Sequence, residues 1–301
     1  MTIKPGLDLS NFDQSVRPQD DIFRYVNGAW LRDVAIPEDQ ATYGSFMILR
    51  DLSEQHVREI LEDAAANPKP GVSQKIGDMY GSFLDEAQVN ALGSEPIQAD
   101  LKRIADITSL SELTALIGEL ENQGINSLVG MYVNNDPGNP ERYLVNIYQG
   151  GLGLPDESYY REEKYAEFRE AYLPFIAKML QLAGWSDADA NAGAKKIYAF
   201  EEELATHHWN VVDSRDAEKT YNLKSFAELE DLSGSFSWAQ WLAGAKIEQR
   251  VLAESVVMMP SFLQGLDSVY NEGNLETIKL WLAFNVVNQI CLLYTSDAAD
   301  D

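Results

Sequence analysis

The chain has 301 residues, of which 45% are hydrophobic and 24% charged, so it can bury a sizeable core as one large domain or two smaller ones. Its formal net charge of −25 argues against nucleic acid or an anionic membrane as a partner, because both would repel it. A single cysteine excludes an internal disulfide framework. The sequence shows neither an apolar run long enough to span a membrane nor an apolar signal core, so a cytoplasmic protein is expected.

Four separate helices are predicted within the first 122 residues. Asp20 and Asp21 can cap a helix that ends before Pro37. A second helix is predicted from Ser45 to about Ala66, where the segment NPKPG at 67–71 stops it. Apolar residues at 76, 79, 80, 83, 84 and 87 follow helical spacing and predict a third helix, and a short one follows at about 111–122.

Two runs rich in β-branched and aromatic residues then predict an antiparallel β-hairpin. They are INSLVGMYV at 125–133 and RYLVNIY at 142–148, with DPGNP between them. From residue 163 the pattern is again helical, with Pro174 as a kink or a helix start and Gly184 as a C-terminal cap. The later elements predicted are a helix from a capping box at Ser186 and Asp189 to about His208, helices near 224–231 and 238–245, a strand-like VVMM at 256–259, and helices at 260–270 and 274–290.

No catalytic or metal-binding group is complete within the chain. The three histidines are His56, His207 and His208, and the last two are adjacent, so on a helix they point about 100° apart and do not form the HExxH zinc motif. Glu203, four residues before His207, suits a helical ion pair. The run from Glu201 to Glu203 is interpreted as a solvated helical face, and the histidines as structural or surface residues.

The last eleven residues differ in character from the apolar pattern that precedes them. The peptide CLLYTSDAADD at 291–301 resembles the translation of a transposon-end sequencing adapter. We therefore expect residues 1–290 to be the natural sequence and 291–301, with Cys291 and Leu293, to be read-through without a selected packing partner. A frayed natural C-terminus is the alternative.

Two stretches carry a resemblance to a known family. DDIFRYVNGAWLRDVAIPEDQATYGSF at 20–46 resembles the opening of the neprilysin and endothelin-converting-enzyme family of zinc metallopeptidases, and YQGGLGLPDESYY at 148–160 resembles that family's Q-x-G-L-G-L-P-x-x-x-Y-Y signature. Weaker blocks agree in order through about residue 290, and the likeness is to the N-terminal half of soluble bacterial members. The matching residues are Asn27, Gly28, Trp30, Pro37, Gly44 and Phe46 in the first block, and Gly151, Leu152, Gly153, Leu154, Pro155, Tyr159 and Tyr160 in the second.

The resemblance implies a mainly α fold: a helical lid lobe with a small antiparallel β-hairpin. In the family this lobe closes over a catalytic lobe that carries zinc and the glutamate base, and the cavity between them admits small peptides. The zinc motif lies downstream of the residues present, so the resemblance implies zinc in the intact enzyme, none in this fragment, and the missing C-terminal lobe as a partner on which the first about 40 residues can pack. The implied activity is that of a zinc metalloendopeptidase, which the fragment alone lacks.

The resemblance carries over only one substrate-proximal residue. Family members use an arginine after the I-P pair, with an aspartate and a second arginine, around the substrate's C-terminal carboxylate. Here Thr42 and Met47 occupy the first two positions and only Arg50 matches the third. A guanidinium suits a carboxylate, but Arg50 can equally pair with Asp51 or Glu54. The departures favour endopeptidase action over a dipeptidyl-carboxypeptidase preference.

A noncatalytic helical module that binds proteins or peptides is the second hypothesis. The sequence of the intact gene after Ile290 distinguishes the two, because an HExxH motif there supports the peptidase and a stop codon supports the binding module. In either case we expect Trp30, Phe46 and Leu154 to be largely buried, and Gly151 or Gly153 to adopt backbone angles that other residues avoid.

Overall fold

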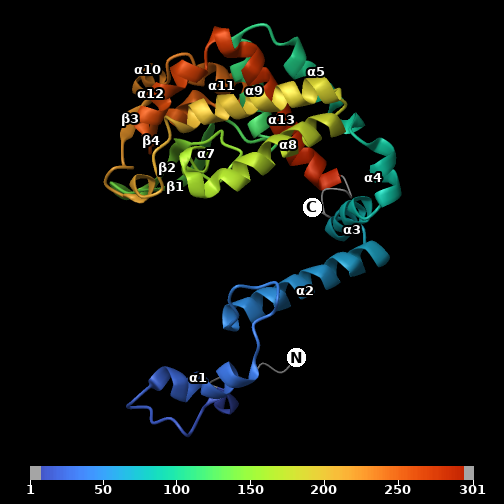
Figure 1. The fold of residues 1–301 in the computed structure, drawn as a ribbon, viewed down its shortest axis with the longest axis vertical. Helices are drawn as coiled ribbons and strands as arrows, with labels where there is room; N and C mark the ends of the chain where they lie inside the picture. The colour runs from blue at the N-terminus through green and yellow to red at the C-terminus, as the bar shows by residue number, and fades with distance from the viewer. Residues whose placement is uncertain (1–7, 295–301) are drawn as a thin grey trace. The chain divides into compact units, whose positions relative to one another are not determined.

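The computed structural model describes residues 8–294, and side chains as far as residue 289. The chain divides into two compact units, Met1–Leu84 and Asp85–Asp301. Figure 1 shows the elements of both, and each unit is described by itself. None of the helices formed by the described residues is long and apolar enough to cross a membrane.

The first unit consists of helices that bury very little. After a 3-10 turn at Leu9–Asn11 come α1 (Ile22–Asp33), α2 (Ser45–Ala66) and α3 (Val72–Phe83), which confirms the first two predicted helices closely. The side chain of Asp21 caps α1 by accepting a hydrogen bond from the amide of Arg24. The third helix begins earlier than predicted and ends at Phe83.

The packing of α2 on α3 depends on one small residue. A Cβ atom on Gly77 would lie 2.3 Å from the carbonyl oxygen of Ala64, so the two helix backbones approach closely only because this residue is glycine. Within residues 8–84, only Ala29, Ala64 and Gly77 are buried. The described part of the first unit therefore has almost no hydrophobic core of its own.

The expected burial of motif aromatics is wrong for one residue in this unit. Phe46 is 84% exposed, although its motif block suggested a packed position. Trp30 is half-buried and stacks on Tyr43 with 6.4 Å between ring centroids. The sequence pattern marks Phe46 as apolar, but nothing in the described part of its own unit covers it.

The second unit is a helical layer around a small sheet. Its helices are α4 (Glu86–Leu92), α5 (Glu95–Asp106), α6 (Leu110–Glu121), α7 (Ser158–Arg161), α8 (Ala166–Leu182), α9 (Asp187–Ala205), α10 (Phe226–Ser233), α11 (Trp238–Ala245), α12 (Pro260–Val269) and α13 (Leu275–Tyr294). Short 3-10 turns lie at 163–165, 213–215, 249–252 and 272–274. The mainly α prediction is confirmed, although α4 and α5 were not predicted and α9 ends at Ala205 rather than near His208.

The predicted hairpin is present as part of a larger sheet. β1 (Val129–Asp136) and β2 (Asn139–Gln149) pair antiparallel, and β2 also pairs in parallel with β4 (Glu254–Val257). β3 (Leu223–Ser225) closes the strand order β1-β2-β4-β3. The strand-like run at 256–259 thus belongs to the same sheet as the hairpin, which local sequence patterns did not show.

Asp136 fixes the turn of the hairpin to the far edge of the sheet. Its carboxylate, 1% exposed, accepts hydrogen bonds from Arg142 Nε at 2.7 Å, Tyr221 Oη at 2.8 Å and the amide of Gly138 at 2.8 Å. Arg142 also pairs with Glu254 on β4 at 2.7 Å. These contacts satisfy a buried carboxylate and hold β1, β2 and β4 in one register.

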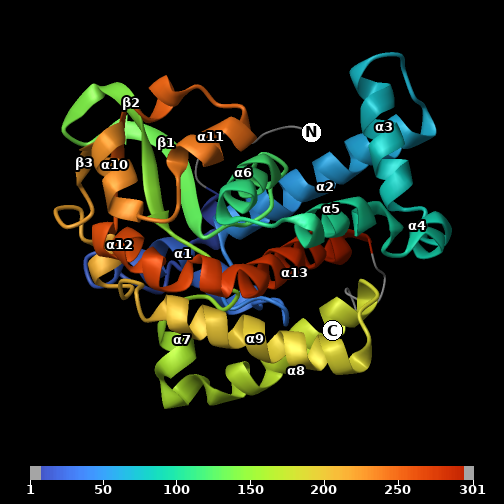
Figure 2. The same ribbon diagram turned by 90° about the horizontal axis from the view of Figure 1, so that it is seen from above.

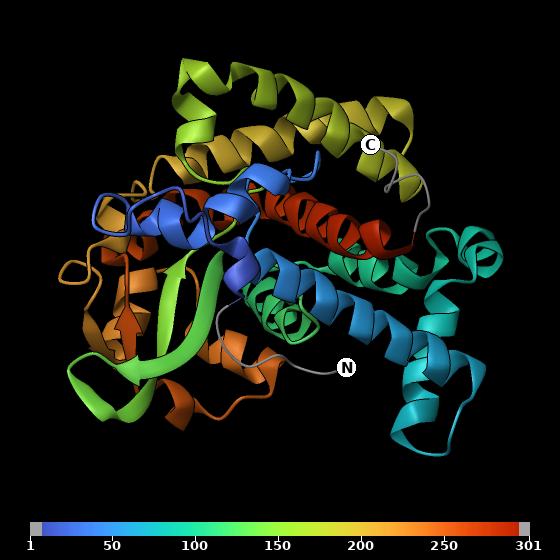
Figure 3. The ribbon, with the colours of Figure 1, turned by 90° about the horizontal axis from the view of Figure 1, so that it is seen from below.

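Helix α13 is the centre of the hydrophobic core. It packs against α8 and α9 on one side and α5 and α6 on the other, as Figures 2 and 3 show from opposite directions. Its residues from Ile278 to Val287 are buried on nearly all faces, among them Trp281 and Phe284 at 1% exposure each. The helix continues past Ile290 to Tyr294, and the prediction on the packing of Cys291 and Leu293 concerns side chains outside the described residues.

Candidate functional site

The second family-like motif forms an irregular segment between the sheet and the helices. Gln149 ends β2, residues 150–157 follow without regular structure, and α7 begins at Ser158. Gly151 has φ of +88°, a backbone conformation that glycine adopts readily, so this part of the glycine prediction is confirmed. Leu154 is half-buried rather than largely buried.

A buried carboxylate organises this segment. Glu201 on α9 is 1% exposed and accepts hydrogen bonds from Tyr160 Oη at 2.8 Å, from Tyr172 Oη at 3.0 Å and from Trp281 Nε1 at 3.2 Å. The backbone of Gly153 is a further hydrogen-bond donor to it. One side chain therefore joins the motif segment to α7, α8, α9 and α13.

Burial and hydrogen bonding act in opposite directions on this carboxylate. Burial raises the pKa of Glu201 to about 7, and the hydrogen bonds from Tyr160, Tyr172, Gly153 and Trp281 limit the rise. The prediction of a solvated face at Glu201–Glu203 is thus wrong for Glu201, whereas Glu202 and Glu203 are exposed. Glu201 follows Ile197 by four residues and precedes Leu204 by three, which places it on the apolar face of α9.

Tyr160 links the carboxylate to the backbone of the motif. Its hydroxyl donates to Glu201 and accepts a hydrogen bond of 3.1 Å from the amide of Leu154. Gly153 lies so close to this cluster that a Cβ atom there would be 1.7 Å from Tyr172 Oη. Gly153 is therefore required for close approach rather than for a positive φ.

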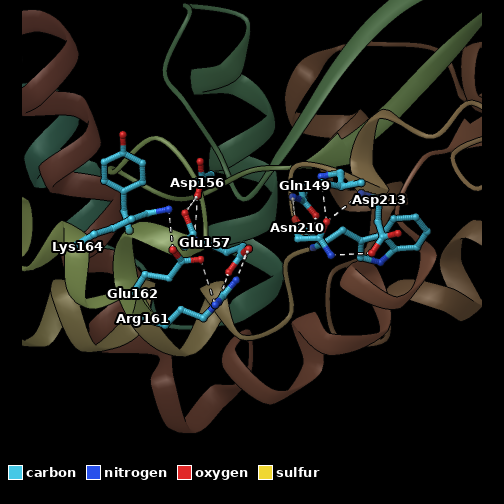
Figure 4. A network of polar contacts seen from close by, with 12 residues as sticks. Gln149, Asp156, Glu157, Arg161, Glu162, Lys164, Asn210 and Asp213 are labelled. Carbon is cyan, nitrogen blue, oxygen red and sulfur yellow. Dashed lines mark hydrogen bonds and ion pairs between the residues drawn. The ribbon is translucent and has the colours of Figure 1, made fainter.

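The start of the motif segment is held by the residues that follow α9. The side-chain amide of Gln149 donates to the carbonyl of Trp209 at 2.9 Å, and its carbonyl oxygen accepts from the amide of Trp209 at 2.7 Å; Figure 4 labels Gln149 beside Asn210 and Asp213. His208 Nε2 donates to the carbonyl of Gly150 at 2.9 Å. Burial lowers the pKa of His208 to about 4, so this ring is neutral at pH 7.

Ion pairs hold the other end of the motif segment, as Figure 4 also shows. The guanidinium of Arg161 binds both oxygens of the buried Glu157, at 2.6 and 3.1 Å. Glu162 pairs with Lys164 at 2.8 Å. Asp156 accepts from the amide and hydroxyl of Ser158, at 2.8 and 2.5 Å, and so stabilises the start of α7. These contacts are structural, since every charged group in them already has a partner.

Two cavities adjoin the motif segment. One of about 520 Å³ is lined by Gly150, Gly151 and Leu152 together with residues of α6, β1, α11 and α13. The other, of about 480 Å³, is lined by Gln149 and Pro155 with Tyr132, Trp209 and Met258. Both volumes are within the range of ligand-binding sites in proteins. The two cavities beside the motif segment are therefore the candidate binding region.

The residues of the first motif block lie in the first unit. Asn27, Trp30 and Gly44 line a cavity of about 380 Å³. Gly28 packs closely on the preceding segment, because a Cβ atom there would be 2.6 Å from that of Asp13. Pro37 follows the end of α1, in the loop between α1 and α2.

Arg50 makes the contacts that the sequence offered as the alternative to a substrate role. Its guanidinium pairs with Asp51 at 3.0 Å and with Glu54 at 3.5 Å. Its side chain is half exposed. The substrate-proximal role of Arg50 stays a prediction.

The histidines have separate contacts. His207 Nε2 shares a hydrogen bond of 2.7 Å with Ser268, whereas His208 bonds to Gly150. His56 lines a shallow cavity between α2 and α3. No group of three or more histidine, cysteine, aspartate or glutamate side chains with the arrangement of a metal site occurs among the described residues.

Comparison with known proteins connects this geometry with one family. The family model for the N-terminal part of peptidase family M13 matches residues 18–301. Mouse membrane metallo-endopeptidase-like 1 is 29% identical over 93% of this chain and 40% of its own length, and human neprilysin is 26% identical over 91% and 40%. The structure of the zinc metalloprotease Zmp1 from Mycobacterium tuberculosis in complex with an inhibitor matches with a TM-score of 0.85 and 37% identity, over 98% of this chain and 45% of that one. The chain thus spans less than half the length of these relatives.

Removal of the Tyr160 hydroxyl tests the central contact of the motif segment. In Tyr160→Phe the buried Glu201 loses a donor and the Leu154 amide loses its acceptor, so we expect the free energy of unfolding to fall by about 1–3 kcal/mol. Chemical denaturation monitored by circular dichroism measures the change. The control is Tyr198→Phe, which removes only an exposed hydroxyl bonded to Glu202 at 3.4 Å; an equal effect of both substitutions would contradict the assignment.

The raised pKa of Glu201 predicts a pH dependence of stability. The folded protein keeps this carboxyl protonated up to about pH 7, whereas the unfolded chain releases the proton near pH 4.5. The folded state therefore binds more protons in this window, and the contribution of Glu201 to stability is lost as the pH rises from about 4.5 to about 7. Its size is up to about 3 kcal/mol.

Unfolding free energies at pH 5 and pH 7.5 measure this effect, compared between the wild type and Glu201→Gln. We expect the decrease between the two pH values to be smaller in the variant, because glutamine does not titrate. Glu202→Gln, at the exposed neighbouring position, serves as the control and should keep the wild-type decrease. The same decrease in Glu201→Gln as in the wild type would show that Glu201 does not titrate in this window.

Proposed function

Because this chain belongs to peptidase family M13, we propose that it is the N-terminal, noncatalytic lobe of a zinc metalloendopeptidase that cleaves small peptides. The observation that carries the proposal is the match of nearly the whole chain to less than half of a zinc metalloprotease structure at a TM-score of 0.85. In this proposal the catalytic groups belong to the remaining half of the enzyme. The lobe's role is to enclose and position the peptide, and to exclude water from it.

The surface of the first unit supports a docking role for this segment. Its large apolar side chains are exposed, including Phe23 at 63%, Phe46 at 84% and Met79 at 78%. So many exposed apolar residues on one short segment mark an interaction surface. We propose that the downstream catalytic lobe covers them, which would explain why a motif residue such as Phe46 has no partner in the described part of its own unit.

The residues that the structure describes do not fit a catalytic zinc ion. Zinc in such enzymes is held by three protein ligands that converge on one point. His207 and His208 make hydrogen bonds to different elements, and the described residues contain no suitable group of ligands. We therefore propose that zinc binds in the part of the enzyme outside this chain.

Three finer assignments belong to the same proposal. Endopeptidase rather than dipeptidyl-carboxypeptidase action is favoured because Thr42 and Met47 replace two of the family's carboxylate-binding residues and only Arg50 remains. Residues 291–301 are proposed to be adapter read-through. A cytoplasmic location stays a prediction.

The experiment begins with the genomic sequence beyond the codon of Ile290. We expect an open reading frame that encodes HExxH and, further on, E-x-x-x-D. The intact product should hydrolyse short peptides and lose this activity with a chelator, whereas the purified 301-residue chain should not hydrolyse them. A stop codon directly after Ile290, or chelator-sensitive hydrolysis by the 301-residue chain, would contradict the proposal.

The docking role of the first unit can be tested by the peptidase activity of the intact protein. Phe46→Asp places a charge on the proposed contact surface and should lower peptidase activity at least about 10-fold by weakening the association of the lobes. The matched control is Val212→Asp in the second unit, since Val212 is also more than four-fifths exposed at 81%. Equal activity of both variants would contradict the proposal that Phe46 lies on the surface that contacts the catalytic lobe.

A further inference from the structure

The cavity beside the motif segment contains a carboxylate without a cationic partner. Glu121, at the end of α6, lines the cavity of about 520 Å³ together with Ser127, Tyr148 and Trp241. No lysine, arginine or histidine lines it, and none of the described cationic side chains pairs with Glu121. Glu121 is half-buried, and a paired cation, the usual compensation for a carboxylate withdrawn from water, is absent among the described residues.

The hydrogen bonds of Glu121 satisfy it only in part. The indole Nε1 of the buried Trp241 donates to its carboxylate. Burial raises the pKa of Glu121 to about 7, while the indole and the Ser127 hydroxyl lower it. A positive charge in the cavity would offset the cost of burial and stabilise the ionised form.

The second feature of the cavity is a buried hydroxyl in its wall. Ser127 is 6% exposed, and its hydroxyl, although close enough to Glu121 to influence it, makes no well-formed hydrogen bond. Buried hydroxyls in proteins are nearly always hydrogen-bonded, so an unpaired one in a cavity wall is available to a ligand.

The aromatic wall completes the arrangement. The ring of Tyr148 lies over Gly130, where a Cβ atom would be 2.1 Å from the ring, so only glycine allows this close approach. The ring lines the cavity and is 39% exposed. An aromatic face, a carboxylate and an unpaired hydroxyl acceptor are the groups that bind ammonium and guanidinium ions in proteins.

We propose that this cavity binds the basic side chain of a peptide, an arginine or a lysine. Glu121 supplies the charge, Ser127 accepts one N–H of the ligand, and Tyr148 packs on the aliphatic part or the cationic face of the side chain. The proposal depends only on the second unit, whose described residues form the entire wall, and it does not rest on the peptidase assignment.

The test uses the 301-residue chain and two short blocked peptides that differ only in charge, one with arginine and one with citrulline. Isothermal titration calorimetry should give a dissociation constant at least about 10-fold lower for the arginine peptide. The indole N–H resonance of Trp241, identified by its loss in Trp241→Phe, should shift with the arginine peptide, because Trp241 donates to the carboxylate that the ligand approaches.

Glu121→Gln should abolish the preference for arginine, whereas Glu141→Gln should retain it. Glu141 is exposed, lies at the other end of β2 and does not line the cavity, so it matches the charge change alone. Equal binding of the two peptides by the wild type, no binding of either, or an unchanged preference in a folded Glu121→Gln variant would each overturn the proposal.

Discussion

The buried carboxylate of Glu201 is the interaction on which the second unit depends. It is the point where a segment without regular structure, residues 150–157, is fixed to four helices. A buried carboxylate is costly to remove from water, and it is retained here by hydrogen bonds from Tyr160, Tyr172, Trp281 and the backbone of Gly153. The segment can therefore keep one conformation although residues near both of its ends line cavities.

This constraint explains the residue types of the motif. Position 153 must be glycine because the backbone there lies close to Tyr172, and position 151 favours glycine because its φ is positive. Tyr160 must carry a hydroxyl, because it both donates to Glu201 and accepts from Leu154. The residues of the family-like signature at 148–160 are thus explained by how this segment folds and packs. None of them needs a direct role in catalysis.

The sequence predicted the elements better than it predicted the contacts. Helical spacing located α1, α2 and α13, and β-branched runs located β1, β2 and β4, because these patterns are local. The pairing of β2 with β4 and the contact of Asp136 with Tyr221 join residues about 85 or more positions apart, so no local pattern shows them. The prediction that Glu201 is exposed to solvent was wrong because it was based on the acidic residues that follow it. The spacing of Glu201 from Ile197 and Leu204 indicates instead that it lies on the apolar face of α9.

Phe46 was misjudged for a different reason. The motif block indicated a packed position, and the exposed apolar side chains of residues 8–84 show that the described part of this unit does not supply the packing. The two units therefore differ in kind. The second has a continuous core around α13, whereas the described part of the first has many exposed apolar side chains.

Amide hydrogen exchange at Gly153 and Leu154 tests most directly whether Glu201 holds the motif segment. Both amides lie outside helices and strands, and their acceptors are Glu201 and Tyr160. We expect slow exchange in the wild type, acceleration of at least about 10-fold in Glu201→Ala, and little change in Glu202→Ala, with the β1–β2 amides as an internal reference in all three proteins. Fast exchange at these two amides in the wild type, or the same exchange in Glu201→Ala as in the wild type, would contradict it.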